Sequence, residues 1–215
     1  GEVPLSIPIQ LEKVGRGSEG GNLTVGGKSG SQSSEGIPIF DVEVFGGNDL
    51  PNNLASMTST NNDLRTVNIE SNGNGELTPD ADLADGETPF ANLTIGNSQT
   101  VGTPFGGGLA EVNADAFNGD LALGTNAKPV SNLSTLNANG DGDLDLSATS
   151  LGELNAASIG GNVDADVTFK TDIETAGGTD DIRVFQADAS TIDTDGDSDK
   201  VVLTGASSGE YDFAE

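Results

Sequence analysis

Two neighbouring stretches of this sequence are imperfect copies of each other. Residues 133–150 read LSTLNANGDGDLDLSATS and residues 151–167 read LGELNAASIGGNVDADV, so Leu136 and Asn137 recur as Leu154 and Asn155. Each copy continues through a glycine-containing turn into a stretch where apolar and polar residues alternate. A period of about twenty residues with glycine at the corners is typical of chains that stack successive coils. The repeat therefore predicts a solenoid rather than a globular fold.

The alternation of apolar and polar residues predicts that the coils are built from β-strands. Pairs such as Val67 and Ile69 place apolar side chains on one face of a strand. We therefore predict an all-β fold: a parallel β-solenoid (β-helix or β-roll) preceded by an irregular N-terminal β region. Strands are expected at residues 7–14, 22–27, 37–45, 65–71, 91–97, 110–115, 120–124, 132–138, 143–148, 152–157, 162–170, 180–185 and 199–205.

The chain divides by composition at about residue 64. Residues 1–64 hold strands separated by a loop rich in glycine and serine, and we expect this region to form either a small β-domain or strands that pair with a neighbouring subunit. Residues 65–215 are expected to form the solenoid, with about six or seven coils. Because a stack of coils exposes unpaired strands at its ends, the sequence predicts self-assembly or continuation into more protein.

The charge of the chain restricts its partners. Thirty-five acidic residues face eight basic ones, which gives a net charge of −27. A nucleic acid needs a basic surface and an anionic membrane would repel this chain, so we expect neither as a partner. No apolar stretch approaches the ~18 residues that span a bilayer, so membrane insertion is not expected. Self-repulsion at this charge density predicts that cations or salt stabilise the folded state.

The missing residue types argue against most catalytic chemistry. The chain has no cysteine and no histidine, so disulfides, thiol or imidazole catalysis and zinc or copper sites are not expected. Tryptophan is absent and there is one tyrosine, which leaves few aromatic platforms for a sugar-cleaving site. We therefore expect a protein that is not an enzyme. The absence of cysteine fits a secreted protein, located outside the cell or at its surface, and the abrupt start at Gly1 fits a processed product or a segment of a longer protein.

Three acid-rich turns are candidate sites for calcium, which takes about six to eight oxygen ligands. The first has oxygen-bearing residues at alternate positions and a glycine at the sixth, and the second has four alternating carboxylates. The third has the Gly-x-Asp-x-apolar spacing of a parallel β-roll turn. The alternative for the first two turns is a solenoid turn or loop with solvated acids. The predicted ligands are Asn137, Asn139, Asp141, Asp143 and Asp145 in the first turn, Asp193, Asp195, Asp197 and Asp199 in the second, and Asp180 and Asp181 in the third.

Several segments of the chain resemble the β-solenoid regions of bacterial S-layer and related RTX-type surface proteins. The segments are RTVNI, NLSTLNA, DLDLSA, GGTDDIRVF and DGDSDKVVLTG, which lie between residues 65 and 205. The resemblance implies calcium-dependent assembly. We expect a non-enzymatic, secreted structural subunit of a cell-surface layer, sheath or extracellular filament, whose partners are further copies of itself. The alternative is an adhesin-type binding module that recognises a carbohydrate or surface protein, with a cell-surface glycan as partner.

Overall fold

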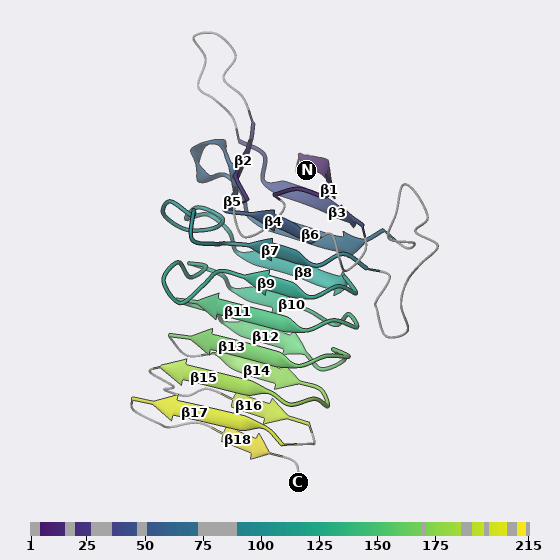
Figure 1. Ribbon diagram of the computed structural model, residues 1–215. Helices are drawn as coiled ribbons and strands as arrows, with labels where there is room; N and C mark the ends of the chain where they lie inside the picture. Colours follow the sequence, from purple (N-terminus) through teal and green to yellow (C-terminus); the bar gives the residue numbers. More distant parts are fainter. Residues whose placement is uncertain are drawn as a thin grey trace, which may run out of the picture.

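The computed structural model describes residues 5–15, 20–26, 36–46, 51–72, 90–168, 171–185, 191–195, 198–205 and 210–213. Their strands stack into two long sheets that lie face to face, with the N-terminal strands at one end of the stack and the C-terminal strands at the other (Figure 1). From β6 onward, successive strands alternate between the two sheets, so each coil contributes one strand to each. The predicted all-β parallel solenoid is confirmed.

The larger sheet has nine strands and the smaller has seven, and the pairs within both are parallel. In spatial order, the nine-stranded sheet consists of β1 (Ser6–Glu12), β3 (Ile39–Phe45), β6 (Thr66–Ser71), β8 (Glu111–Ala116), β10 (Thr135–Asn137), β12 (Glu153–Ala156), β14 (Asp172–Thr175), β16 (Thr191–Thr194) and β18 (Glu210–Phe213). The seven-stranded sheet consists of β17 (Lys200–Thr204), β15 (Asp181–Phe185), β13 (Val163–Val167), β11 (Leu144–Ala148), β9 (Leu121–Leu123), β7 (Leu93–Ile95) and β4 (Asn52–Leu54).

The remaining elements lie near the N-terminal end of the stack. Strands β2 (Asn22–Val25) and β5 (Ser56–Ser59) pair in a separate two-stranded sheet, and a short 3-10 helix spans Thr60–Asn62. Within the described ranges there is no α-helix, and no helix is long and apolar enough to cross a membrane.

The strand register reproduces the repeat seen in the sequence. Leu136 of β10 lies opposite Leu154 of β12, and the asparagines that follow them are also partners. In the other sheet, Leu144 of β11 lies opposite Val163 of β13. Equivalent residues of the two copies therefore stack directly on one another, because parallel strands in register place identical faces in line.

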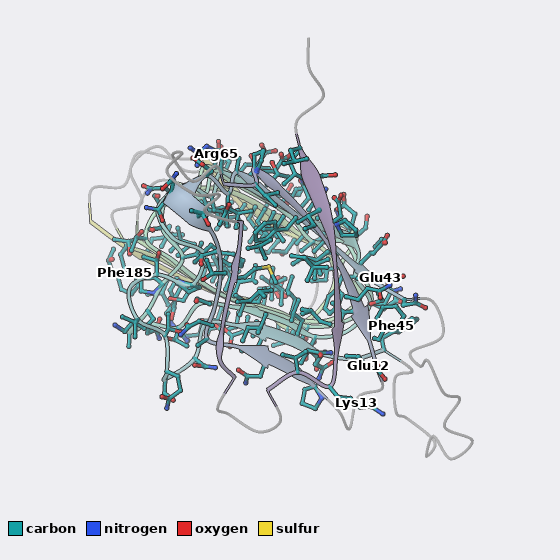
Figure 2. All side chains as sticks on the ribbon, turned by 90° about the horizontal axis from the view of Figure 1, so that it is seen from above. Glu12, Lys13, Glu43, Phe45, Arg65 and Phe185 are labelled. Atoms are coloured by element: carbon teal, nitrogen blue, oxygen red, sulfur yellow. The ribbon has the colours of Figure 1, made fainter. Side chains whose placement is uncertain are left out.

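The core is an apolar, mostly aliphatic layer between the two sheets. In the nine-stranded sheet one inward column holds an apolar residue in every strand from β3 to β16, and each of these residues is at most 3% exposed. This column contains Phe40, Val67, Val112, Leu136, Leu154, Ile173 and Ile192. Seen down the stack, side chains fill the space between the sheets, with Arg65 where the nine-stranded sheet's strands begin and Phe45 where they end (Figure 2).

Glycines at one corner of the solenoid allow successive coils to approach closely. A Cβ atom added to Gly161 would lie 2.6 Å from the carbonyl oxygen of Gly142, and one added to Gly178 would lie 2.9 Å from that of Gly161. A Cβ atom added to Gly142 would likewise clash with the carbonyl oxygen of Gly119. Ordinary contacts begin at 3.4 Å, so a side chain at this corner would force neighbouring coils apart. This column explains the regular spacing of glycine in the sequence.

The N-terminal region is continuous with the solenoid through its hydrogen bonding. Strands β1 and β3 precede residue 65, yet β1 pairs with β3 and β3 pairs with β6 in the nine-stranded sheet. Leu11 and Phe40 also belong to the same core as the later coils. The proposed contact of residues 1–64 with a neighbouring subunit stays a prediction.

Five strands were not expected from the sequence. Strands β4 and β5 lie in a polar, asparagine-rich stretch, and β14, β16 and β18 lie in segments that the sequence pattern predicts as connections between strands. Each of these last three has few aliphatic residues, as in DIET, TIDT and EYDF. Strands β14, β16 and β18 form because they pair with a neighbouring coil, not because their residues have strong β-propensity.

Candidate functional site

The corner that leads into the seven-stranded sheet is held together by polar side chains. The carboxylate of Asp143 accepts a hydrogen bond from the amide of Asn162 at 2.7 Å, and its own amide donates to Asp120 at 3.1 Å. The chain of hydrogen bonds continues in both directions. The backbone amide of Asp120 donates to the side-chain oxygen of Asn92, and the backbone amide of Thr179 donates to the side-chain oxygen of Asn162. Each coil is thus joined to the next by one side-chain oxygen, which acts as a fixed acceptor.

A second set of polar contacts runs along the outer face of the nine-stranded sheet. The Asn68 amide group donates to Asp41 at 2.7 Å, Asn113 donates to Asn68 at 3.1 Å, and Asn137 donates to Asn113 at 2.8 Å. These residues are register partners on consecutive strands and are only partly buried. Asn137, predicted as a calcium ligand, therefore forms part of an asparagine ladder between coils.

The predicted ligands of the first turn point to different surfaces. Asn137 faces outward from the nine-stranded sheet, and Asn139 donates to Asp115 and accepts from the amide of Ser158. Asp141 and Asp143 are exposed at the corner between the sheets. Asp145 faces outward from β11 in the seven-stranded sheet. The turn therefore spreads its oxygen atoms over two faces and a corner instead of closing them around one point.

The third turn also separates its two acids. Asp181 faces outward on β15 and pairs with Lys200 and Arg183, with 2.8 Å between its carboxylate and the Lys200 ammonium. The hydrogen bond from Lys200 lowers the pKa of Asp181. Asp180 lies inward and is only 1% exposed. Adjacent residues of a strand point to opposite faces, which explains the separation.

The ligands predicted in the second turn have varied positions. Asp193 lies outward on β16, and Asp195 is exposed just after it. Asp199 precedes β17, and its carboxylate accepts a hydrogen bond from the Asp180 amide at 3.1 Å. Asp197 lies outside the described residues. The structure thus brings together Asp180 and Asp199, which the sequence had placed in two different turns.

Acids from several coils line a shallow depression of about 370 Å³ on the outer face of the seven-stranded sheet. Asp145, Asp164 and Asp181 lie in register there on β11, β13 and β15. Partial burial raises the pKa of Asp145, and the nearby Asp164 and Asp166 carboxylates raise it further. The acids that line the depression are Asp120, Asp143, Asp145, Asp164 and Asp181.

Basic residues neutralise only one end of this acidic column. Arg183 lies 3.1 Å from the Asp166 carboxylate and 3.8 Å from that of Asp164. Burial raises the pKa of Asp164, and the Arg183 guanidinium opposes this effect. Asp145 lies farther along the column, and among the described residues no salt bridge joins it to a lysine or arginine.

Sequence reasoning missed Asp120, Asp164, Asp166, Arg183 and Lys200 as members of this surface. A usable signal was present, because Asp145, Asp164 and Asp181 are separated by 19 and 17 positions, close to the length of one coil. Aligning the coils by length would have placed their carboxylates in one column.

The chemistry available to these surfaces is binding or cohesion through oxygen atoms. In the part of the chain that is described, no group of three or more acidic residues is arranged to hold a metal ion. Calcium binding by the predicted ligands stays a prediction. Comparisons with protein-family models, curated proteins and solved structures yielded no match to this chain.

Proposed function

We propose that this chain is a non-enzymatic structural subunit of an extracellular layer, sheath or filament. In this proposal, calcium orders its acidic coils and strand pairing joins one copy to the next. The observation that carries the proposal is that polar side chains form hydrogen bonds between successive coils. The corner residues and the asparagine ladder bond from coil to coil, which suits a cohesive rod more than a catalytic cleft.

Unpaired strand edges support the self-assembly part of the proposal. Among the described strands, β1 pairs only with β3, β18 pairs only with β16, and β17 pairs only with β15. The free edge of a parallel sheet presents backbone N–H and C=O groups that can pair with another strand. A second copy whose first coil met the last coil of this one would continue both sheets.

The net charge supports the calcium part. At −27, a chain with closely stacked acids repels itself unless the charge is screened or neutralised. Repulsion between acids is concentrated on the outer face of the seven-stranded sheet, because successive strands there lie only about 4.8 Å apart. Divalent cations that bridge coils would remove the repulsion while they tighten the stack.

The proposal is tested by following assembly and stability of the full chain with calcium, with EGTA and with excess calcium restored. Electron microscopy and light scattering report assembly, and circular dichroism reports unfolding, since tryptophan is absent. We expect ordered assemblies and a higher Tm with calcium, and the loss of both in EGTA.

A control with molar KCl separates specific binding from charge screening. Equal recovery of stability and assembly in KCl would support salt screening, as in a protein adapted to high salt, and would contradict calcium ordering. A chain that stays monomeric under every condition and binds a defined carbohydrate would instead support the adhesin alternative.

A further inference from the structure

Two consecutive coils repeat a threonine followed five positions later by an aspartate. The segments are Thr175 to Asp180 (TAGGTD) and Thr194 to Asp199 (TDGDSD). Thr175 and Thr194 are register partners on β14 and β16, and both face the interior, at 2% and 1% exposure. The preceding coil has Ala156 at the same place in the column. The interior therefore becomes polar in these two coils.

The aspartates occupy the matching position in the opposite sheet. The register of β13, β15 and β17 aligns Val163, Asp180 and Asp199 in one column. In the coil before Val163, the same column holds Leu144. In that earlier coil the Leu144 amide donates to a backbone carbonyl. Here the Val163 amide donates to the Asp180 carboxylate at 2.8 Å, and the Asp180 amide donates to the Asp199 carboxylate at 3.1 Å. Side-chain oxygens thus replace backbone acceptors, and two carboxylates lie one coil apart.

Of the four buried side-chain oxygen atoms without a hydrogen-bond partner in the described residues, Oδ1 of Asp181 lies on the outer side of β15 and three lie in the interior of these coils. The three interior atoms are Oδ2 of Asp180 and the hydroxyl oxygens of Thr175 and Thr194. Burial raises the pKa of Asp180, while the nearby Thr175 hydroxyl and the Val163 amide lower it and Asp199 raises it. The Thr175 hydroxyl therefore lies close to the Asp180 carboxylate. Buried polar atoms are satisfied in nearly all native proteins, so these three atoms indicate a ligand.

The basic residues described nearby act elsewhere. Lys200 donates to Asp181, and Arg183 pairs with Asp166 and Asp181, all on the outer face of the sheet. A carboxylate enclosed in an aliphatic core is costly without an opposite charge. A water molecule would satisfy the hydroxyl groups but would not neutralise Asp180 and Asp199.

We propose that a calcium ion binds inside the solenoid between these two coils, held by the carboxylates of Asp180 and Asp199 and the hydroxyl groups of Thr175 and Thr194. The ligands come from two turns and two strands, which differs from the contiguous loops predicted from the sequence. Two carboxylates match a divalent charge, and calcium accepts mixed oxygen ligands together with water or carbonyl groups. The inference rests on the calcium part of the proposed function and gives it a location.

The test uses the full chain and compares Asp180→Asn with Glu153→Gln. The asparagine keeps an oxygen that can accept from the Val163 amide but removes the charge, and Glu153→Gln removes the same charge from an exposed position on β12. At calcium about 100 times its dissociation constant, we expect the Tm of the wild type to rise by about 5 to 10 °C. We expect Glu153→Gln to keep this rise and Asp180→Asn to lose it, with a matching loss of the calcium titration in calorimetry.

Thr175→Val is a second variant that leaves the charge unchanged. It replaces a hydroxyl with a methyl group of similar size, and we expect calcium affinity to fall about tenfold or more if that oxygen is a ligand. This variant also provides the test if Asp180→Asn does not fold. An unchanged calcium affinity in both variants would overturn the site.

The outcomes separate this site from the proposed function. If the wild type responds to calcium and Asp180→Asn responds equally, the site is wrong while calcium ordering stands. If the wild type shows no calcium binding, both fall, and electron microscopy still decides whether the chain assembles. If magnesium or KCl gives the same rise in Tm as calcium, the effect is not the proposed calcium site.

Discussion

The glycine corner makes the strongest quantitative prediction for the fold. In Gly161→Ala the new Cβ atom would lie 2.6 Å from the carbonyl oxygen and 2.7 Å from the carbonyl carbon of Gly142. It would also press on the Asp143 carboxylate, which accepts the amide of Asn162. Both Gly142 atoms belong to the backbone and cannot rotate away, so the two coils must separate.

The expected cost follows from this geometry. Overpacking usually destabilises a protein by about 1 to 3 kcal/mol, and a clash with backbone favours the upper end. For a chain of this size, about 3 kcal/mol corresponds to a fall in Tm of about 6 to 12 °C. The cost is conformational and steric, so calcium should not restore the lost stability to the wild-type level.

Circular dichroism melts and urea unfolding of the full chain measure this effect. Gly107→Ala is the matched control, because nothing lies within 4 Å of its added Cβ atom and its backbone carries no positive φ angle. We expect that control to be neutral or to stabilise by about 0.4 to 1 kcal/mol. Equal melting of Gly161→Ala and Gly107→Ala would refute the close-packed glycine column.

Two further predictions concern polar residues. Asn113→Ala removes one hydrogen bond to Asn68 and one from Asn137, so urea unfolding should show a loss of about 1 to 3 kcal/mol; a loss below about 0.5 kcal/mol would mean that the ladder does not stabilise the stack. The raised pKa of Asp145 opposes folding increasingly as the pH rises above its reference value of 3.8 and through its folded pKa. In EGTA, Asp145→Asn should therefore melt above the wild type at neutral pH and level with it at about pH 3, and melting curves with a constant offset would contradict this assignment.

The repeat could be recognised in the sequence because the residues that recur are those that form the core. Leu136 and Leu154 align in the sequence and are partners in the sheet. The alternation around Leu144 and Val163 likewise predicted strands that pair in register. Burial of one face imposes this pattern locally, so the all-β parallel solenoid followed without knowledge of any long-range contact.

The missed strands show where local pattern fails. Strands β14 and β16 place Thr175 and Thr194 in the interior, where sequence reasoning expects aliphatic residues. Their register depends on the neighbouring coil, since a strand with one strongly apolar residue cannot position itself. Only the stacked structure identifies them as core positions.

For the acidic residues too, the sequence determined some properties and the tertiary structure determined others. The sequence alone determined that the chain is strongly acidic, that its coils repeat, and that acids cluster at turns. It could not determine whether two acids meet, because residues about one coil apart approach only after the coils stack. Stacking placed Asp143 in a chain of corner hydrogen bonds and Asp145 on an outer face. It also brought Asp180 of one turn to Asp199 of the next, a contact decided by the register of parallel strands.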